Sequence, residues 1–116
     1  MSKRGDAEFV CDILEAIKRI EQYVEKCDYA KFLEDNMIQD AVVRNLEIVG
    51  EAVKNISETA KEKYGNIEWK KLAGMRDRIV HFYFGVNWDI VWDVIKNRLP
   101  ELKKQIELIL KVDNDA

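Results

Sequence analysis

Proline, glycine, histidine and cysteine are all scarce in this chain of 116 residues. One proline and five glycines leave little room for a β-rich fold with many turns, which favours helices. No apolar run approaches the ~20 residues that a membrane span needs, and the first residues do not resemble a signal peptide, so we expect a cytoplasmic location. The 47% hydrophobic and 35% charged residues are typical of one globular domain over residues 1–116.

The two cysteines, Cys11 and Cys27, lie 16 residues apart on what the pattern predicts to be one helix. Thiols so far apart along a helix do not easily reach each other, so we expect free thiols rather than a disulfide. The sequence also lacks a cluster of cysteine and histidine, or closely spaced inward carboxylates, that would hold a metal ion. We therefore expect neither a metal nor another cofactor.

The formal net charge of −3 excludes a chain that is basic throughout, as many nucleic-acid binders are. Residues 61–78 are different, because their six cations and three anions give this segment a charge of +3. A solvated helix face with a chance excess of lysine would give the same pattern. The charge distribution alone therefore does not establish binding to RNA.

Apolar residues recur at steps of three and four along four long stretches, the spacing of one face of a helix. We expect helices over residues 6–27, over residues 36–56, from after Asn66 to about residue 84, and from residue 88 to about 112. The face over 36–56 is wide enough to be buried against more than one neighbour.

Shorter helices are expected over residues 29–33 and 58–63, and Asp28, Ser57 and Asn87 are placed to act as N-caps. Pro100 should kink or break the last long helix between Asn97 and Pro100, and the residues from 113 onward should fray. No pattern of strands is visible. The sequence predicts an all-α antiparallel bundle of four or five helices.

Arg76, His81 and Tyr83 form the most informative pattern in the chain. His81 is the only histidine, Arg76 lies five residues before it, and Tyr83 lies two residues after it. Arginine carries a permanent charge and forked donors that suit a phosphate, and histidine is the side chain that best exchanges a proton near neutral pH. Together these residue types point to phosphodiester chemistry on RNA.

On a regular helix Arg76 and Tyr83 share a face, whereas Arg76 and His81 point roughly 140° apart. One straight helix therefore does not bring the arginine and the histidine together. Either the helix ends near His81, or two copies meet across a two-fold axis so that the arginine of one faces the histidine of the other. We favour the second arrangement, in a homodimer, with some contribution from the first.

The chemistry would be transesterification of RNA. A base removes the proton of a 2′-hydroxyl, the oxygen attacks the adjacent phosphorus, and an acid protonates the leaving 5′-oxygen. His81 can transfer the protons, and Arg76 can stabilise the charge of the transition state. Asp77, four residues before His81, could orient the imidazole, and Arg78 supplies a second cation. An ordinary histidine and a surface arginine at this spacing occur by chance, so the spacing alone leaves that simpler interpretation open.

Three segments of the chain resemble the HepT family of HEPN-domain proteins. Residues 76–83, continued by Phe84-Gly85-Val86-Asn87-Trp88, are similar to the Arg-x4-His-x-Tyr motif of that family. Residues 39–52 resemble its second block, and residues 99–102 resemble a third. The three segments occur in the right order and cover nearly the whole chain, which is much more specific than the short motif.

The resemblance implies a small all-α homodimer that acts as a metal-independent ribonuclease toxin of a type VII toxin–antitoxin system. It places Arg76 and His81 at the dimer cleft, and Asp77 stands where the family has a polar residue after the arginine. It also implies a partner, a minimal nucleotidyltransferase antitoxin, which transfers AMP from ATP to Tyr83 and so silences the toxin.

Two other functions fit the same residues. The chain could be a non-catalytic nucleotide-binding or scaffold partner of the nucleotidyltransferase, in which Arg76, Arg78 and Tyr83 receive a nucleotide without cutting RNA. It could also be a purely structural helical dimer. Incubation of the protein with RNA in EDTA distinguishes a nuclease, which should produce RNA fragments, from the non-catalytic partner, which should not.

Overall fold

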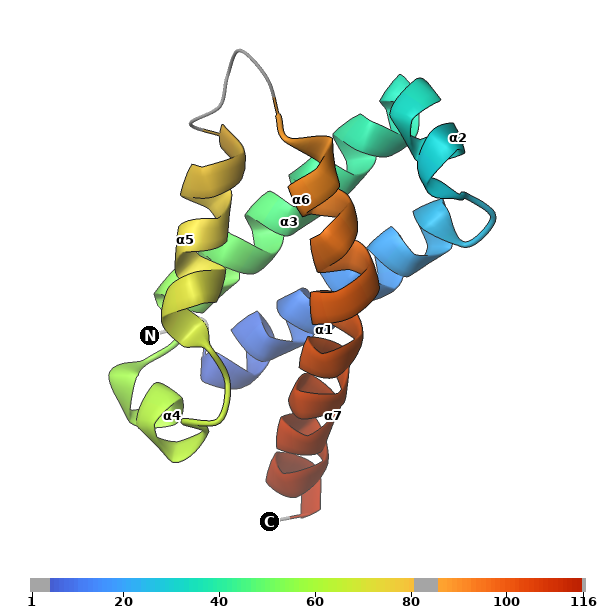
Figure 1. The fold of residues 1–116 in the computed structure, drawn as a ribbon. Helices are drawn as coiled ribbons and strands as arrows, with labels where there is room; N and C mark the ends of the chain where they lie inside the picture. Colours follow the sequence, from blue (N-terminus) through green and yellow to red (C-terminus); the bar gives the residue numbers. More distant parts are fainter. Residues whose placement is uncertain (1–4, 81–85, 116) are drawn as a thin grey trace.

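A computed structural model describes residues 5–80 and 86–115, and within those ranges it contains helices and no strand (Figure 1). The helices are α1 (Asp6–Val24), α2 (Tyr29–Glu34), α3 (Asn36–Asn55), α4 (Glu58–Lys63), α5 (Trp69–Val80), α6 (Trp88–Asp93), the π-helical segment η1 (Val94–Arg98) and α7 (Leu99–Asp115). The predicted all-α bundle is confirmed. No helix within the described ranges is long and apolar enough to cross a membrane.

Side-chain caps begin the helices where the sequence predicts them. The carboxylate of Asp28 accepts from the Lys31 N–H of α2 at 2.8 Å, and the hydroxyl of Ser57 accepts from the Ala60 N–H of α4 at 3.1 Å. Each cap satisfies a backbone donor that the first turn leaves unpaired. The Asn87 cap of α6 is also confirmed, and its side-chain oxygen accepts from two backbone N–H groups.

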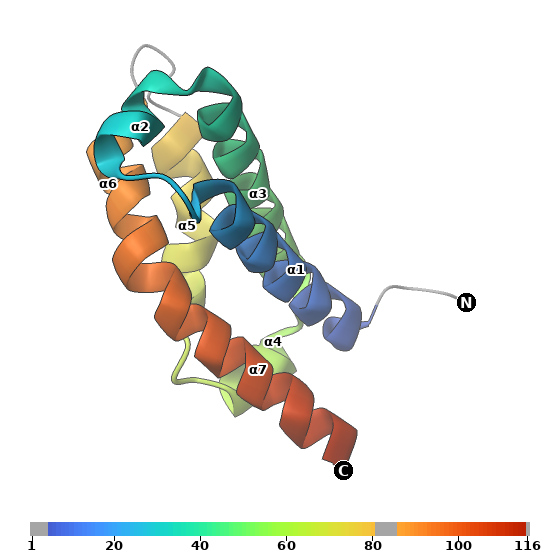
Figure 2. The same ribbon diagram turned by 90° about the vertical axis from the view of Figure 1, so that its right-hand side faces the viewer.

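The four long helical pieces form two layers (Figures 1 and 2). α1 and α3 lie side by side in one layer, and α5 and the continuous rod α6–η1–α7 cross them in the other. α3 packs against both α1 and α5, so the prediction of a helix buried against more than one neighbour is confirmed. α7 packs against α1, and a partly buried ion pair of 2.9 Å joins Lys103 to Glu21. The hydrogen bond from Lys103 to Glu21 raises the pKa of the lysine.

The core lies between the two layers and consists mainly of branched aliphatic side chains. Apart from Phe32 of the short helix α2, its fully buried members come from the apolar positions spaced by three and four: Ile13, Ile17, Ile20, Val42, Leu46, Val49, Val53, Val91, Leu99 and Ile106. Burying one such side chain contributes about 1.5–3 kcal/mol, so this stripe-to-stripe contact is what holds the four pieces together.

Pro100 is preceded by the π-helical segment η1, which starts six residues before it. The Leu99 N–H donates to the carbonyl of Val94, five residues back instead of four. Proline has no N–H to donate, and its ring crowds the preceding turn, which the wider π turn accommodates. The expected break is therefore wrong, because the helix changes its type locally and continues as one rod through α6, η1 and α7.

Three helix boundaries differ from the predictions. α1 ends at Val24 rather than at residue 27, and α5 begins at Trp69, later than expected. α7 continues to Asp115, so the expected fraying from residue 113 is wrong for the backbone. The predicted end of the third long helix near residue 84 lies outside the described residues. Boundary residues are the weakest part of a pattern-based prediction because capping geometry, and not periodicity, decides them.

Replacing Ile17 by alanine should destabilise the fold by about 2–5 kcal/mol, because the side chain is fully buried between the layers. Leu108→Ala is the matched control, since Leu108 is 62% exposed and its loss should change stability by at most about 0.5 kcal/mol. Urea unfolding followed by circular dichroism measures both. Equal midpoints for the two variants would contradict this account of the core.

Candidate functional site

The helix that carries the motif is anchored at its first turn. The indole N–H of Trp69 donates to the backbone carbonyl of Tyr64 at 3.1 Å, and the ring is buried in the core. Met75, two turns further along α5, is also buried, and Leu72 between them is half-buried. These contacts hold one flank of α5 against α3 and leave its other flank open.

Only part of the predicted catalytic motif falls within the described residues. Arg76, Asp77 and Arg78 all lie in the last turns of α5, and the side chains of Asp77 and Arg78 are exposed. His81 and Tyr83 lie outside the described residues, so their expected meeting with Arg76 stays a prediction. Positions 76 and 78 are roughly 200° apart around a helix, which assigns them to different sides of α5.

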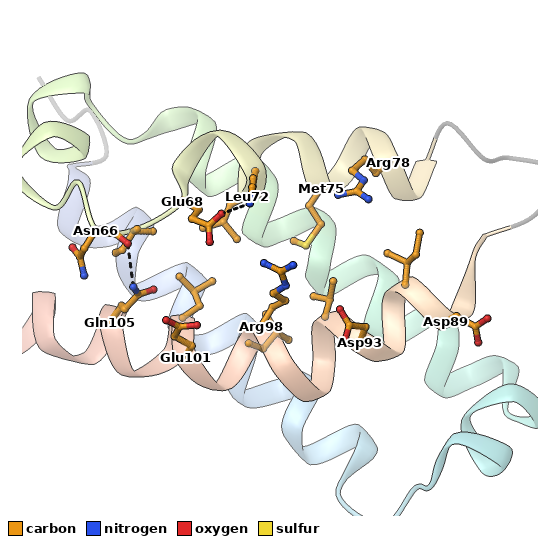
Figure 3. Close-up of a pocket in the computed structure, with 16 residues that line it drawn as sticks. Asn66, Glu68, Leu72, Met75, Arg78, Asp89, Asp93, Arg98, Glu101 and Gln105 are labelled. Carbon is orange, nitrogen blue, oxygen red and sulfur yellow. Dashed lines mark hydrogen bonds and ion pairs between the residues drawn. The ribbon is translucent and has the colours of Figure 1, made fainter.

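A groove separates α5 from the rod α6–η1–α7 and has a volume of about 450 Å³ (Figure 3). Figure 3 shows Leu72 and Met75 on the α5 side, with Arg98 extending from the rod toward them. The apolar residues that line the groove come from both walls: Ile67, Leu72, Met75, Ile90, Val94, Leu99 and Leu102. The groove exists because α5 packs on α3 and the rod packs on α1, so that the two stand apart.

Charged side chains of both signs surround this apolar surface. Arg78 stands on the α5 wall, and Arg98 on the rod. Glu68, directly before α5, forms an ion pair of 2.7 Å with Lys71. The hydrogen bond and charge of Lys71, with a smaller contribution from Arg98, lower the pKa of Glu68. Among the described residues, neither Arg78 nor Arg98 has an ion-pair or hydrogen-bond partner. Asp89, Asp93 and Glu101 also line the groove, so its lining carries four carboxylates and three cations.

An aromatic cluster fixes the wall formed by α6. The ring of Trp88 meets Phe32 edge-on at 5.6 Å, and Trp92 packs against both Phe32 at 5.1 Å and Tyr29 at 5.7 Å. Such ring pairs add about 0.5–1.5 kcal/mol each beyond their burial. The short helix α2 thus packs against the rod and supports it at the end of the groove nearest the motif.

The sequence analysis identified Arg78 but missed Arg98 and the groove. Arg98 is the last residue of the π-helical segment, and only the packing of the rod turns it toward α5. No spacing in the sequence signals this orientation, because it depends on tertiary packing.

A buried asparagine was also missed. Asn45 on α3 is 4% exposed, and its amide donates to the carbonyl of Ala41 at 2.9 Å. Its Oδ1 atom has no hydrogen-bond partner in the described part of the chain. The described residues also contain no group of three or more histidine, cysteine, aspartate or glutamate side chains that could hold a metal ion.

Comparison with known proteins identifies the class to which this helical fold and motif belong. The family model described as Ribonuclease HepT-like matches residues 13–109, which include the whole stretch from Arg76 to Tyr83. The chain belongs to the HepT-like ribonuclease family. No solved structure gives a significant match to the chain.

Individual relatives cover almost the same length. A protein of Methanocaldococcus jannaschii named as a candidate RNase, MJ1216, is 45% identical over 111 residues, covering 96% of this chain and 92% of the relative. A protein named probable ribonuclease HepT, from Thermococcus cleftensis, is 40% identical over 109 residues, covering 94% of this chain and 99% of the relative. A candidate RNase of Caldanaerobacter subterraneus, TTE0752, is 42% identical over 99 residues, covering 85% and 88%.

Proposed function

We propose that this protein is an endoribonuclease that cleaves RNA by Arg76- and His81-dependent transesterification. The observation that carries the proposal is the Arg-x4-His-x-Tyr motif at residues 76–83, inside the segment that matches a ribonuclease family. In this proposal the chain acts as one domain in the cytoplasm, and no metal takes part in the reaction.

The proposed reaction needs two proton transfers and one stabilised charge. A neutral His81 takes the proton of the 2′-hydroxyl, and the new bond from the 2′-oxygen to phosphorus expels the 5′-oxygen, which receives a proton from a protonated imidazole. Arg76 offsets the charge that develops on the phosphoryl oxygens. The products are a 2′,3′-cyclic phosphate and a free 5′-hydroxyl.

In this proposal a second copy of the chain brings the arginine and the histidine together, which one straight helix does not. Positions 76 and 81 diverge by roughly 140° on a regular helix, so a two-fold pair would place the arginine of one protomer by the histidine of the other. Each site would then combine the arginine of one protomer with the histidine of the other. Asp77 and Arg78, both exposed on α5, would support the imidazole and the phosphate respectively.

The protein would be the toxin of a toxin–antitoxin pair. Its partner would be a minimal nucleotidyltransferase that transfers AMP from ATP to the Tyr83 hydroxyl and releases pyrophosphate. The added phosphate and adenosine would occupy the cleft where RNA binds, and Arg76 is the natural partner for the phosphate charge. Such a modification blocks the site without unfolding the chain.

The chain should sediment as a dimer of about twice 13.6 kDa at micromolar concentration in dilute buffer. Arg76→Ala and His81→Ala chains, each inactive alone, should regain part of the activity when mixed and exchanged, because one cleft of a mixed dimer could then be complete. A monomer at all micromolar concentrations, or no recovery on mixing, would rule out the composite site.

His81→Ala should lower RNA cleavage by ~10²–10⁴, because the reaction loses its proton-transfer group. The assay is total RNA incubated in EDTA, with detection of fragments that end in a cyclic phosphate. Circular dichroism of the variant controls for folding. Activity within a few-fold of the parent would exclude His81 as acid or base, and an inactive parent would favour the non-catalytic scaffold.

Tyr83→Phe should still cleave RNA, since the phenol hydroxyl transfers no proton in this scheme, but should resist neutralisation by an active nucleotidyltransferase. Mass spectrometry of the wild-type pair, coexpressed, should find AMP on the peptide that contains Tyr83. AMP on another residue, or neutralisation of Tyr83→Phe by the enzyme, would refute this mode of control.

A further inference from the structure

We propose that the seam between α1 and α3 holds a binding site for a primary ammonium group, carried by a small aliphatic amine. A pocket of about 240 Å³ opens along this seam, and none of its lining residues lines the groove between α5 and the rod. The lining comes from one flank of α1 and from α3: Asp12, Glu15, Ala16, Arg19, Asn45 and Ile48. The inference is independent of the proposed ribonuclease function, because no residue of the motif takes part.

The amide oxygen of Asn45 points to a ligand at this seam. The side chain is 4% exposed, and its nitrogen donates to the Ala41 carbonyl of the same helix at 2.9 Å. A carbonyl only accepts, which fixes the nitrogen on that side and leaves Oδ1 as the polar atom that the amide offers to the pocket. Among the described residues Oδ1 has no hydrogen-bond partner. A buried acceptor without a partner destabilises a fold, so a donor is expected there.

The rest of the lining supplies mainly acceptors. The half-buried Asp12 and the exposed Glu15 contribute carboxylates from α1, and Arg19 contributes a guanidinium group, so the lining carries two negative charges and one positive charge. A carboxylate has several acceptor positions, so the contacts that Asp12 already makes leave room for another. A primary ammonium has three donors and no acceptor, which match the Asn45 oxygen and the two carboxylates.

An exposed ion pair competes with the ligand for one of these carboxylates. Arg19 donates to Glu15 at 2.8 Å, and their side chains are 53% and 64% exposed. Exposed pairs of this kind add little stability, so an ammonium group displaces the guanidinium at small cost. Removal of Arg19 should therefore strengthen the binding of an amine.

The apolar part of the lining suits a short carbon chain. Ala16 is buried and Ile48 is half-buried, and both line the pocket. A methylene chain lies well along such side chains while its ammonium reaches polar groups, as lysine does. The volume of about 240 Å³ lies below the range of about 300–1,000 Å³ typical of larger ligands, so the occupant is a small amine.

The test titrates butylamine into the full chain at constant ionic strength. The side-chain amide signal of Asn45, followed by nuclear magnetic resonance, should shift and saturate, and the midpoint of thermal unfolding should rise with amine concentration. Butanol has the same carbon chain without the charge and should cause neither change. Sodium chloride is the control for a general ionic effect.

Four variants test the individual contacts. Asn45→Leu and Asp12→Asn should each weaken butylamine binding about 10- to 100-fold, because each removes an acceptor for a charged donor. Asp40→Asn, which removes the same charge from an exposed position of α3 outside the pocket, should change binding less than two-fold. Arg19→Ala should strengthen binding. Without amine, Asn45→Leu should be at least as stable as the parent, because it removes the unpaired acceptor.

The outcomes decide between a ligand and simpler partners for Asn45. Loss of the saturable response in Asn45→Leu and Asp12→Asn, with the response kept in Asp40→Asn, would support the site. If Asn45→Leu does not fold by circular dichroism, Asp12→Asn and Arg19→Ala decide, with their opposite expected effects. No response in the parent would mean that water or the chain itself serves Asn45. That result, an equal response to sodium chloride, or an unchanged response in Asp12→Asn would overturn the proposal, whether or not the protein cleaves RNA.

Discussion

The burial of α3 on two sides is the constraint on which the rest of the structure depends. Its wide apolar face is covered by α1 on one side and by α5 on the other, and Val42, Leu46, Val49 and Val53 are fully buried as a result. α5 therefore takes its position from α3 and not from the rod. The rod is held by α1 and by the aromatic rings of α2. Two walls positioned by different supports leave a groove between them.

The same division explains why the motif helix can be both rigid and accessible. Trp69 and Met75 fasten one flank of α5 to the core, while Asp77 and Arg78 remain exposed on the turns beyond. The role proposed for Arg76 needs a firmly packed backbone and a side that solvent and substrate can reach. In this fold the requirement is met because α5 lacks a neighbour on one side, whereas α1 and α3 have neighbours on both.

The helices and caps could be predicted from the sequence because each depends on local chemistry. The steps of three and four in α1 and α3, and the side chains of Asp28, Ser57 and Asn87, carry their own structural signal. The groove could not be predicted, because it depends on how far apart two helices stand, and no periodicity encodes that distance. Arg98 and Asn45 were missed for the same reason, since tertiary packing decides which charge faces a groove and which amide is buried. The motif at 76–83 was visible as chemistry, but the meeting of its arginine with its histidine stays a prediction, because His81 lies outside the described residues.

In an ordinary helix, a change of length also rotates every residue that follows. The π-helical turn before Pro100 lets the length of the rod change without such a rotation. A π turn contains about one residue more than an α turn, so residues 94–98 could lose a residue and close as an α turn while the helices on either side keep their faces. A deletion within α7 itself would instead rotate everything beyond it by roughly 100° and take Ile106 and Ile109 out of the core. The stretch that supplies Arg98 is thus the part of the rod where length and charge can vary among descendants of this sequence without disturbing the core.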